Sequence, residues 1–198
     1  MHPGAIDDLA AAVCADRTIS EQQLRALLDL PAGGDAQHAL QAAAVRIRRH
    51  FRGDRLSFCS ILNAKGGRCS EDCRYCGQAR GVEAAVTDWL EDAQIRAAAA
   101  DCAATGAWAL SLVAAWRGLR APARVAMVCR SIAAVADSGI RADASLGLIE
   151  ADGIAEELRA AGLRVYHHNL ETARSHFPHT CSTHGWADRL ATIERVQG

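Results

Sequence analysis

Leu56-Ser-Phe-Cys-Ser-Ile-Leu62 and the segment after it, Asn63-Ala-Lys-Gly-Gly-Arg-Cys-Ser-Glu-Asp-Cys-Arg-Tyr-Cys-Gly-Gln78, carry the strongest structural signal in this chain. The first part is a short apolar run, which predicts a buried strand. The second part is polar and contains adjacent glycines, which predicts a loop. This loop holds Cys69, Cys73 and Cys76 with the spacing C-x3-C-x2-C, so three thiols directly follow one strand.

Three thiolates in one loop can bind three irons of a 4Fe-4S cluster and leave the fourth iron open to an outside ligand. A four-cysteine zinc site needs a fourth ligand, and a disulfide scaffold needs an even cysteine count in a short secreted chain. A buried cysteine stripe on a helix is disfavoured because charged residues fill the spacers and Gly66-Gly67 breaks a helix. The loop therefore predicts a 4Fe-4S cluster held by Cys69, Cys73 and Cys76.

Length and composition describe an ordinary globular chain. It has 198 residues, 50% of them hydrophobic, and a formal net charge of -1, so it can bury a core and has no basic surface for nucleic acid. It has no apolar run of about 18 residues and no signal-peptide pattern at its start. These features predict a cytoplasmic protein that binds neither nucleic acid nor a membrane. In a reducing compartment its eight cysteines are expected to be thiols or metal ligands.

Helix and strand signals alternate after a helical start. Ser20 is expected to cap a helix that ends at Leu28, and Asp35 a helix that ends near Arg49. These two helices form a predicted N-terminal helical extension over residues 1–50, followed by a core over residues 51–198. Strands are predicted at 56–62, 107–113, 141–147 and 163–168, and helices at 88–104, 122–137, 151–161 and 184–196.

Strands separated by helices of this length predict a parallel sheet with right-handed crossovers. Eight such βα units close a TIM-type barrel of about 250 residues, and this chain supplies four. The predicted fold class is therefore α/β, a partial TIM-type barrel of four βα units. The sequence stops at Val196-Gln-Gly198, within the expected fourth crossover. We expect either a truncation or a half-barrel with an exposed strand edge.

The cysteine loop resembles the cluster loop of the radical S-adenosylmethionine (SAM) enzymes, in which an aromatic residue, here Tyr75, precedes the last cysteine. Cys59-Ser-Ile-Leu-Asn-Ala-Lys65, Arg68-Cys-Ser-Glu-Asp-Cys73 and Tyr166-His-His-Asn-Leu-Glu-Thr172 are similar to the biotin synthases in particular. The resemblance runs from about Leu24 to the last residue. It implies a (βα)8 barrel with a 4Fe-4S cluster and SAM as cofactors.

The resemblance also assigns four residues to SAM. Asn169 and Glu171 match positions that hydrogen-bond the ribose, Asn169 lying near dethiobiotin as well. Arg189 matches an arginine that binds the methionine carboxylate, and Tyr75 an aromatic at the adenine. In a barrel the loops after the strands build the active site, so these residues are expected on the side of the cysteine loop. The alternatives are a polar turn that caps a helix, for Asn169 and Glu171, and a solvated helix arginine, for Arg189.

Five of the eight histidines, and Cys181, lie between His167 and His184. Their spacings do not give a C-x2-C or H-x3-H frame paired with a second half, so the sequence predicts no zinc site in this segment. A similar stretch is compatible with some relatives of the biotin synthases, and the resemblance accounts for it.

Biotin synthases carry a second, sulfur-donating 2Fe-2S cluster, held by cysteines of the second, third and fifth strands and by an arginine. The positions on the second and third strands are Ser111 and Asp143 here. Oxygen ligands are poor replacements for thiolates on such a cluster. His167 also replaces the asparagine of the family's Tyr-Asn-His-Asn word. These departures put the 2Fe-2S cluster and sulfur insertion in doubt.

The resemblance implies a biotin synthase-like enzyme that forms a 5'-deoxyadenosyl radical from SAM to insert sulfur into dethiobiotin, giving biotin. It also implies an electron donor such as flavodoxin or ferredoxin, and homodimers. Two other functions stay open. Ser111 and Asp143 favour a radical SAM enzyme of the same branch without sulfur donation, and the partial barrel favours an inactive Fe-S-binding fragment.

Overall fold

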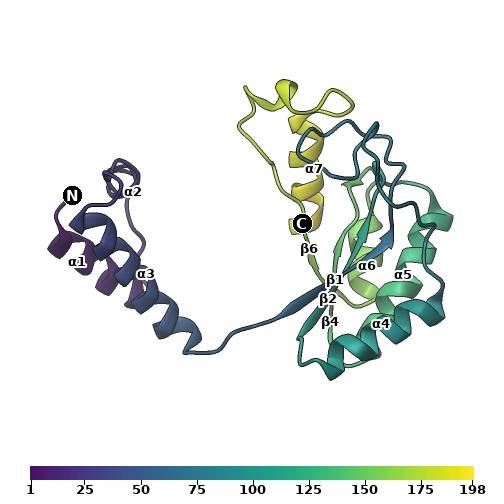
Figure 1. Cartoon of the computed structure of the whole chain (residues 1–198), viewed down its shortest axis with the longest axis horizontal. Helices are drawn as coiled ribbons and strands as arrows, with labels where there is room; N and C mark the ends of the chain where they lie inside the picture. Colours follow the sequence, from purple (N-terminus) through teal and green to yellow (C-terminus); the bar gives the residue numbers. More distant parts are fainter. The chain divides into compact units, whose positions relative to one another are not determined.

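A computed structural model describes residues 1–198, which divide into two compact units, Met1–Leu56 and Ser57–Gly198 (Figure 1). The first unit contains the helices α1 (Pro3–Cys14), α2 (Glu21–Leu28) and α3 (Asp35–Arg52). The predicted cap of α2 is confirmed: the Ser20 hydroxyl accepts the Gln23 N–H at 3.2 Å, and the Ser20 N–H donates to the Gln23 side chain at 2.8 Å. The capping box thereby satisfies two N–H groups at the start of the helix.

Helix α1 corrects the expectation of only two helices in this unit. His2 caps it, since its Nδ1 accepts the Gly4 N–H at 2.9 Å, and Pro3 occupies the first turn. Proline is favourable there because the first turn needs no N–H donor, but histidine is not among the usual capping residues, so the signal was missed. The buried residues of this unit are Ile6, Ala10 and Ala43.

The second unit is built on a four-stranded parallel sheet in the order β1-β2-β4-β6. Strands run in chain order, as expected for consecutive βα units, which confirms the α/β class and the four-unit partial barrel. The strands are β1 (Cys59–Lys65), β2 (Ala109–Ala114), β4 (Arg141–Ser145) and β6 (Leu163–Tyr166), and the helices are α4 (Asp92–Ala104), α5 (Pro122–Ala136), α6 (Ile154–Ala160) and α7 (Trp186–Gln197), with a 3-10 turn at Phe177–His179.

Helices α4, α5 and α6 lie along one side of the sheet (Figure 1). The main core lies between these helices and the sheet. Leu110, Leu112 and Ala144 of the strands belong to it together with Val128 and Ile132 of α5, and all five are buried. Leu110 and Leu112 are two positions apart on β2, so their side chains point to the same face of the sheet.

The prediction of a buried strand at 56–62 is wrong in both its bounds and its burial. Strand β1 begins at Cys59, and Leu56 and Ile61 are 79% and 72% exposed. Strand β1 is at the edge of the sheet, and Ile61 lies on the face opposite to Ala64, which packs in the core. An apolar run alone does not distinguish an edge strand from a central one.

A second, two-stranded parallel sheet of β3 (Gly118–Leu119) and β5 (Leu148–Ile149) was not expected. The predicted strand 141–147 ends at Ser145, and Gly147 then turns the chain with a φ of 76°. A Cβ atom on Gly147 would lie 2.3 Å from the Arg117 carbonyl oxygen, and one on Gly118 would lie 2.2 Å from that of Leu148. Only glycine allows this close approach of the two loops.

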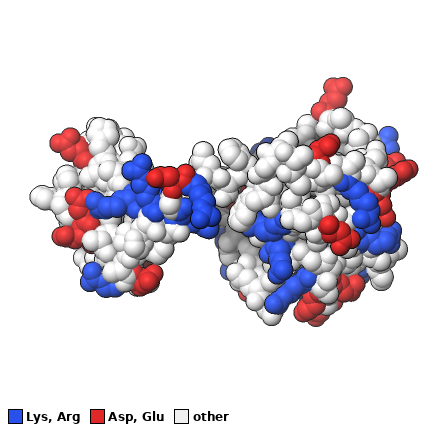
Figure 2. All heavy atoms as spheres, turned by 90° about the horizontal axis from the view of Figure 1, so that it is seen from below, with Lys and Arg blue, Asp and Glu red and all other residues white.

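Acidic and basic side chains are interspersed on the face of each unit that Figure 2 shows. None of the helices combines the length and the apolar character that a membrane crossing requires.

Candidate functional site

A cavity of about 190 Å³ lies where the strands β1, β2, β4 and β6 end and their following loops meet. Three of its lining residues are the cysteines of the loop after β1, and others come from the loops after β2, β4 and β6. The structure brings all seven residues assigned to the cluster and to SAM to this one cavity: Cys69, Cys73, Tyr75, Cys76, Asn169, Glu171 and Arg189.

The cysteine loop is held at its start by hydrogen bonds to the backbone. Lys65, the last residue of β1, donates its ammonium to the carbonyl oxygens of Gly67 at 2.9 Å and of Ala115 at 3.0 Å. The Gln78 side chain accepts the N–H of Gly67 at 3.0 Å. Gly67 has a φ of 65°, and a Cβ atom there would lie 2.8 Å from the Ala85 carbonyl oxygen, so the glycine is needed for this turn.

Asp72 joins the cysteine loop to the segment before α7. Its carboxylate accepts the N–H groups of Ser182 at 2.9 Å and of Thr183 at 3.2 Å, and the hydroxyls of the same two residues. These donors, led by the Ser182 hydroxyl, hold the pKa of Asp72 well below its usual range. The carboxylate is therefore ionised at neutral pH, and it connects two segments that are far apart in the sequence.

Arg189 is held in the cavity by two acceptors. It is 9% exposed, donates from Nη2 to Glu171 Oε1 at 2.9 Å, and donates from Nε to the carbonyl oxygen of Asn169. Glu171 has a φ of 66°, a left-handed conformation that is uncommon for a residue with a side chain. Such backbone conformations cluster at functional sites, where surrounding contacts maintain them. Here the Arg189–Glu171 ion pair is such a contact.

The titratable groups of the cavity fit a bound metal and an organic ligand. Burial raises the pKa of Cys73 to about 12 and also raises the pKa of Cys69, so both are thiols unless a metal binds, because a coordinating thiol is deprotonated outright. Burial likewise raises the pKa of Tyr75. Burial, Arg189 and His184 lower the pKa of His168 to about 4, and its buried Nε2 has no hydrogen-bond partner. His168 is therefore a neutral side chain that can hydrogen-bond to a ligand.

Ser111 and Asp143 lie directly beside each other in the register of β2 and β4, and both are buried. Asp143 Oδ2 accepts from Arg141 Nη2 at 2.6 Å and lies 3.6 Å from His167 Nε2, whereas Oδ1 has no partner. An ion pair between a carboxylate and a guanidinium does not fit an iron-sulfur cluster, which needs soft thiolate donors. Neither residue lines the cavity that holds the three cysteines.

Sequence analysis missed Glu71 and His184 as residues of this site. Glu71 is 6% exposed and its Oε2 lies 2.8 Å from His184 Nδ1 and 3.3 Å from Arg117 Nη1. Burial raises the pKa of Glu71, but hydrogen bonds from Thr183, His184 and Ser70 outweigh it and lower the pKa below its ordinary value. The only signal in the sequence was the acidic pair Glu71-Asp72 between Cys69 and Cys73. Such a pair is equally typical of a solvent-exposed loop.

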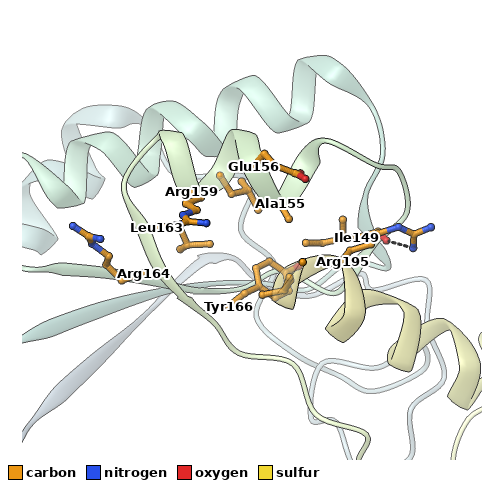
Figure 3. A pocket seen from close by; sticks show the side chains of 11 residues that line it. Ile149, Ala155, Glu156, Arg159, Leu163, Arg164, Tyr166 and Arg195 are labelled. Carbon is orange, nitrogen blue, oxygen red and sulfur yellow. Dashed lines mark hydrogen bonds between the residues drawn. The ribbon is translucent and has the colours of Figure 1, made fainter.

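A further cavity, of about 370 Å³, lies between α6, β6 and α7 and is shown in Figure 3. Its lining includes Arg159, Arg164 and Arg195 but no cysteine and no residue predicted for the site. Arg195 is already engaged by Asp152 and by the Ile149 carbonyl oxygen, each at 3.0 Å. Although larger, this cavity lacks the metal-ligand set of the first.

Comparison with known proteins decides the family. The model of the Radical SAM superfamily matches residues 64–198, which include the three cysteines and all the loops that line the cavity. The chain belongs to the radical SAM superfamily. Membership of this superfamily implies a 4Fe-4S cluster and SAM as cofactors.

Among curated relatives, the radical SAM chain is 40% identical over 192 residues to biotin synthase from Trichlorobacter lovleyi, covering 96% of this chain and 57% of that protein. It is 38% identical over 190 residues to biotin synthase from Pelobacter propionicus, covering 93% of this chain and 58% of that protein. The chain thus spans a little over half the length of these curated relatives.

Two solved structures have the same fold. HydG, a maturase of the [FeFe]-hydrogenase, gives a TM-score of 0.81 at 16% identity, covering 100% of this chain and 44% of HydG. Methylornithine synthase (PylB) gives a TM-score of 0.74 at 16% identity, covering 96% and 55%. At this identity the likeness concerns the radical SAM fold alone.

Proposed function

We propose that this protein is a biotin synthase-like radical SAM enzyme, which uses a 5'-deoxyadenosyl radical to abstract hydrogen from dethiobiotin in the insertion of sulfur that forms biotin. One observation carries the proposal: the three cysteines and the four residues matched to SAM line a single cavity. The similarity to proteins named biotin synthase supports the choice of substrate.

In this proposal Cys69, Cys73 and Cys76 hold the 4Fe-4S cluster and leave one iron for SAM. When bound, the cluster supplies the electron that cleaves SAM into methionine and the 5'-deoxyadenosyl radical. The remaining work is done by the protein, which binds the cofactor, orients it and keeps water away from the radical. A one-electron donor such as flavodoxin or ferredoxin would reduce the cluster before SAM is cleaved, and a homodimer is the assembly that the resemblance implies.

Arg189 holds the methionine carboxylate, because its guanidinium is buried, is oriented by Glu171 and Asn169, and matches a carboxylate with two parallel donors. Glu171 and Asn169 bind the ribose hydroxyls. Tyr75, half exposed beside Cys76, offers its ring to the adenine. His168, neutral and with an unpaired Nε2, supplies a further hydrogen bond to the ligand.

The second candidate is a radical SAM enzyme that does not donate sulfur. The ion pair of Asp143 with Arg141, beside Ser111, favours it, since these residues offer no thiolate for a 2Fe-2S cluster. In that case SAM cleavage and hydrogen abstraction are retained, and the product contains no added sulfur.

The test is an anaerobic turnover of reconstituted, chemically reduced protein with SAM and with dethiobiotin deuterated at the two carbons that receive sulfur. Deuterium in 5'-deoxyadenosine together with biotin supports the proposal. Deuterium transfer without biotin supports the second candidate. Background levels of 5'-deoxyadenosine from protein with a full cluster contradict both and favour an inactive Fe-S-binding fragment. A Cys76→Ser variant serves as the inactive control.

A further inference from the structure

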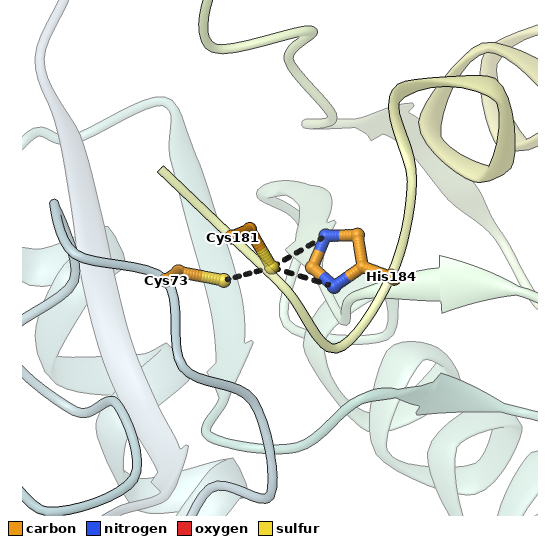
Figure 4. A group of neighbouring side chains, drawn as sticks. All are labelled: Cys73, Cys181 and His184. Carbon is orange, nitrogen blue, oxygen red and sulfur yellow. Dashed lines mark hydrogen bonds between the residues drawn. The ribbon is translucent and has the colours of Figure 1, made fainter. Parts of the chain in front are cut away.

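Cys73 has two neighbours that are not part of the cysteine loop. Figure 4 shows the side chains of Cys73, Cys181 and His184 directed toward one another, the last two coming from the segment that precedes α7. All three are buried, and their ligand atoms lie within 4.8 Å of one another. Cys73 and Cys181 are 108 residues apart in the chain.

The spacing of the two sulfur atoms matches a single tetrahedral ion. The Cys73 and Cys181 Sγ atoms are 3.8 Å apart. Zinc–sulfur bonds of about 2.3 Å place two thiolates on a tetrahedral ion about 3.8 Å apart. A disulfide would need about 2.0 Å, and all eight cysteines are free. A 4Fe-4S cube separates its cysteines more widely, because each binds a different iron.

His184 supplies a ring nitrogen beside the same two sulfur atoms. The ring edge of His184 faces Cys181 Sγ, with Nδ1 at 3.3 Å and Nε2 at 3.9 Å, on either side of the separation of about 3.6 Å between nitrogen and sulfur on tetrahedral zinc. Its Nδ1 lies 2.8 Å from the buried Glu71 Oε2, so the carboxylate can accept the Nδ1 proton and leave Nε2 unprotonated. Ligation through Nε2 then requires the ring to turn away from Arg189 Nη1, which lies 3.4 Å from it. A carboxylate that orients a histidine in this way is the usual support of a zinc ligand.

The charge of the ligands and the access from solvent also suit a divalent ion at this position. Two thiolates neutralise a divalent ion, which limits repulsion by Arg189, whose Nη1 is 3.4 Å from His184 Nε2. Asp72 Oδ1 lies 3.3 Å from Cys181 Sγ, but the Asp72 carboxylate already accepts hydrogen bonds from Ser182 and Thr183 and is not counted as a ligand. A surface hollow of about 570 Å³ is lined by Cys181 and His184 but by none of the three loop cysteines, and it provides a separate entry path.

We propose that Cys73, Cys181 and His184 form a mononuclear site for a soft divalent cation such as Zn²⁺ when no iron-sulfur cluster is present. Binding releases the two thiol protons and forms two metal–sulfur bonds and one metal–nitrogen bond. Because Cys73 is needed by both groups, the zinc ion and the 4Fe-4S cluster exclude each other on one chain. The prediction that residues 167–184 form no zinc site by themselves is compatible with this proposal, because one of the three ligands, Cys73, lies on the cysteine loop. This site does not depend on which substrate the enzyme uses.

The experiment uses the metal-free, full-length chain under anaerobic conditions with a phosphine reductant. Zn²⁺ is titrated against a chromophoric chelator, and Co²⁺ serves as a spectroscopic probe of thiolate ligation. We expect one ion per chain, with thiolate-to-cobalt charge transfer and the d–d bands of a tetrahedral site. Cys181→Ser and His184→Ala should each abolish tight binding, and Glu71→Gln should weaken it by about 10- to 100-fold.

Cys69→Ser and Cys76→Ser are the matched controls. They should keep zinc binding while losing the iron-sulfur cluster, whereas Cys181→Ser should keep the cluster. One equivalent of Zn²⁺ added before iron and sulfide should suppress cluster formation in the wild type but not in Cys181→Ser. Zinc affinity retained by Cys181→Ser, or lost in a Cys69→Ser variant with wild-type circular dichroism, would overturn the site. The zinc measurement requires no SAM cleavage. Loss of the proposed enzyme activity and failure of the zinc site can therefore be told apart.

Discussion

Replacing Arg189 by lysine tests the proposed SAM site with a small change. The Arg189 side chain is 11% exposed, donates from Nη2 to Glu171 at 2.9 Å and donates from Nε to the Asn169 carbonyl oxygen. Lysine keeps the positive charge but offers one nitrogen atom in place of a planar fork. It cannot contact Glu171, the Asn169 carbonyl and a ligand carboxylate with the same geometry.

The expected cost is one charge-assisted hydrogen bond to the ligand, which is worth about 1.5–3 kcal/mol. At 1.4 kcal/mol per factor of ten, this raises the dissociation constant for SAM by roughly 10- to 150-fold. Iron content should not change, because Arg189 is not a metal ligand in the proposed arrangement.

The measurement is SAM binding to cluster-loaded protein by anaerobic calorimetry, together with iron and sulfide analysis of the same samples. Arg174→Lys, an exposed arginine of the same segment, is the control and should bind SAM as the wild type does. Wild-type SAM affinity in Arg189→Lys at full iron content would refute the assignment of Arg189 to the methionine carboxylate.

Four further outcomes are expected. Cys73→Ala should lose the iron and the visible absorbance of anaerobically reconstituted protein, whereas Cys129→Ala should keep both. Leu112→Ala, at a fully buried position, should lower the free energy of unfolding by about 2–5 kcal/mol in urea titrations, and a smaller loss would show that the core collapses around the cavity. Because the folded state depresses the pKa of His168 from 6.5 to about 4, the unfolded state binds more protons between these values, so stability should fall as pH decreases from about 6.5 to 4, and His168→Gln should reduce that slope in apo protein. Ile61→Lys, on the exposed face of the edge strand β1, should reduce any self-association measured by light scattering, and an unchanged mass distribution would exclude this surface.

Local signals in the sequence were sufficient to locate helix α2, the helices α4 to α7 and the strands β2, β4 and β6. The capping box at Ser20 and the alternation of apolar segments depend on residues a few positions apart, so they can be recognised without a structure. The signals failed where the chemistry was unusual or the context was distant. His2 is an uncommon capping residue. Ile61 is exposed because β1 is at the edge of the sheet, which the local sequence does not show.

By itself, the sequence determined the alternating α/β pattern and the spacing of Cys69, Cys73 and Cys76, because secondary structure and a short ligand motif arise from contacts within one segment. The resemblance added Tyr75, Asn169, Glu171 and Arg189 as candidates. Only the tertiary structure placed Cys181 and His184 beside Cys73, and Glu71 beside His184. The contacts of Cys73 and Glu71 with the segment before α7 join parts of the chain more than 100 residues apart, so they form only after the βα units have packed and Asp72 has anchored the cysteine loop.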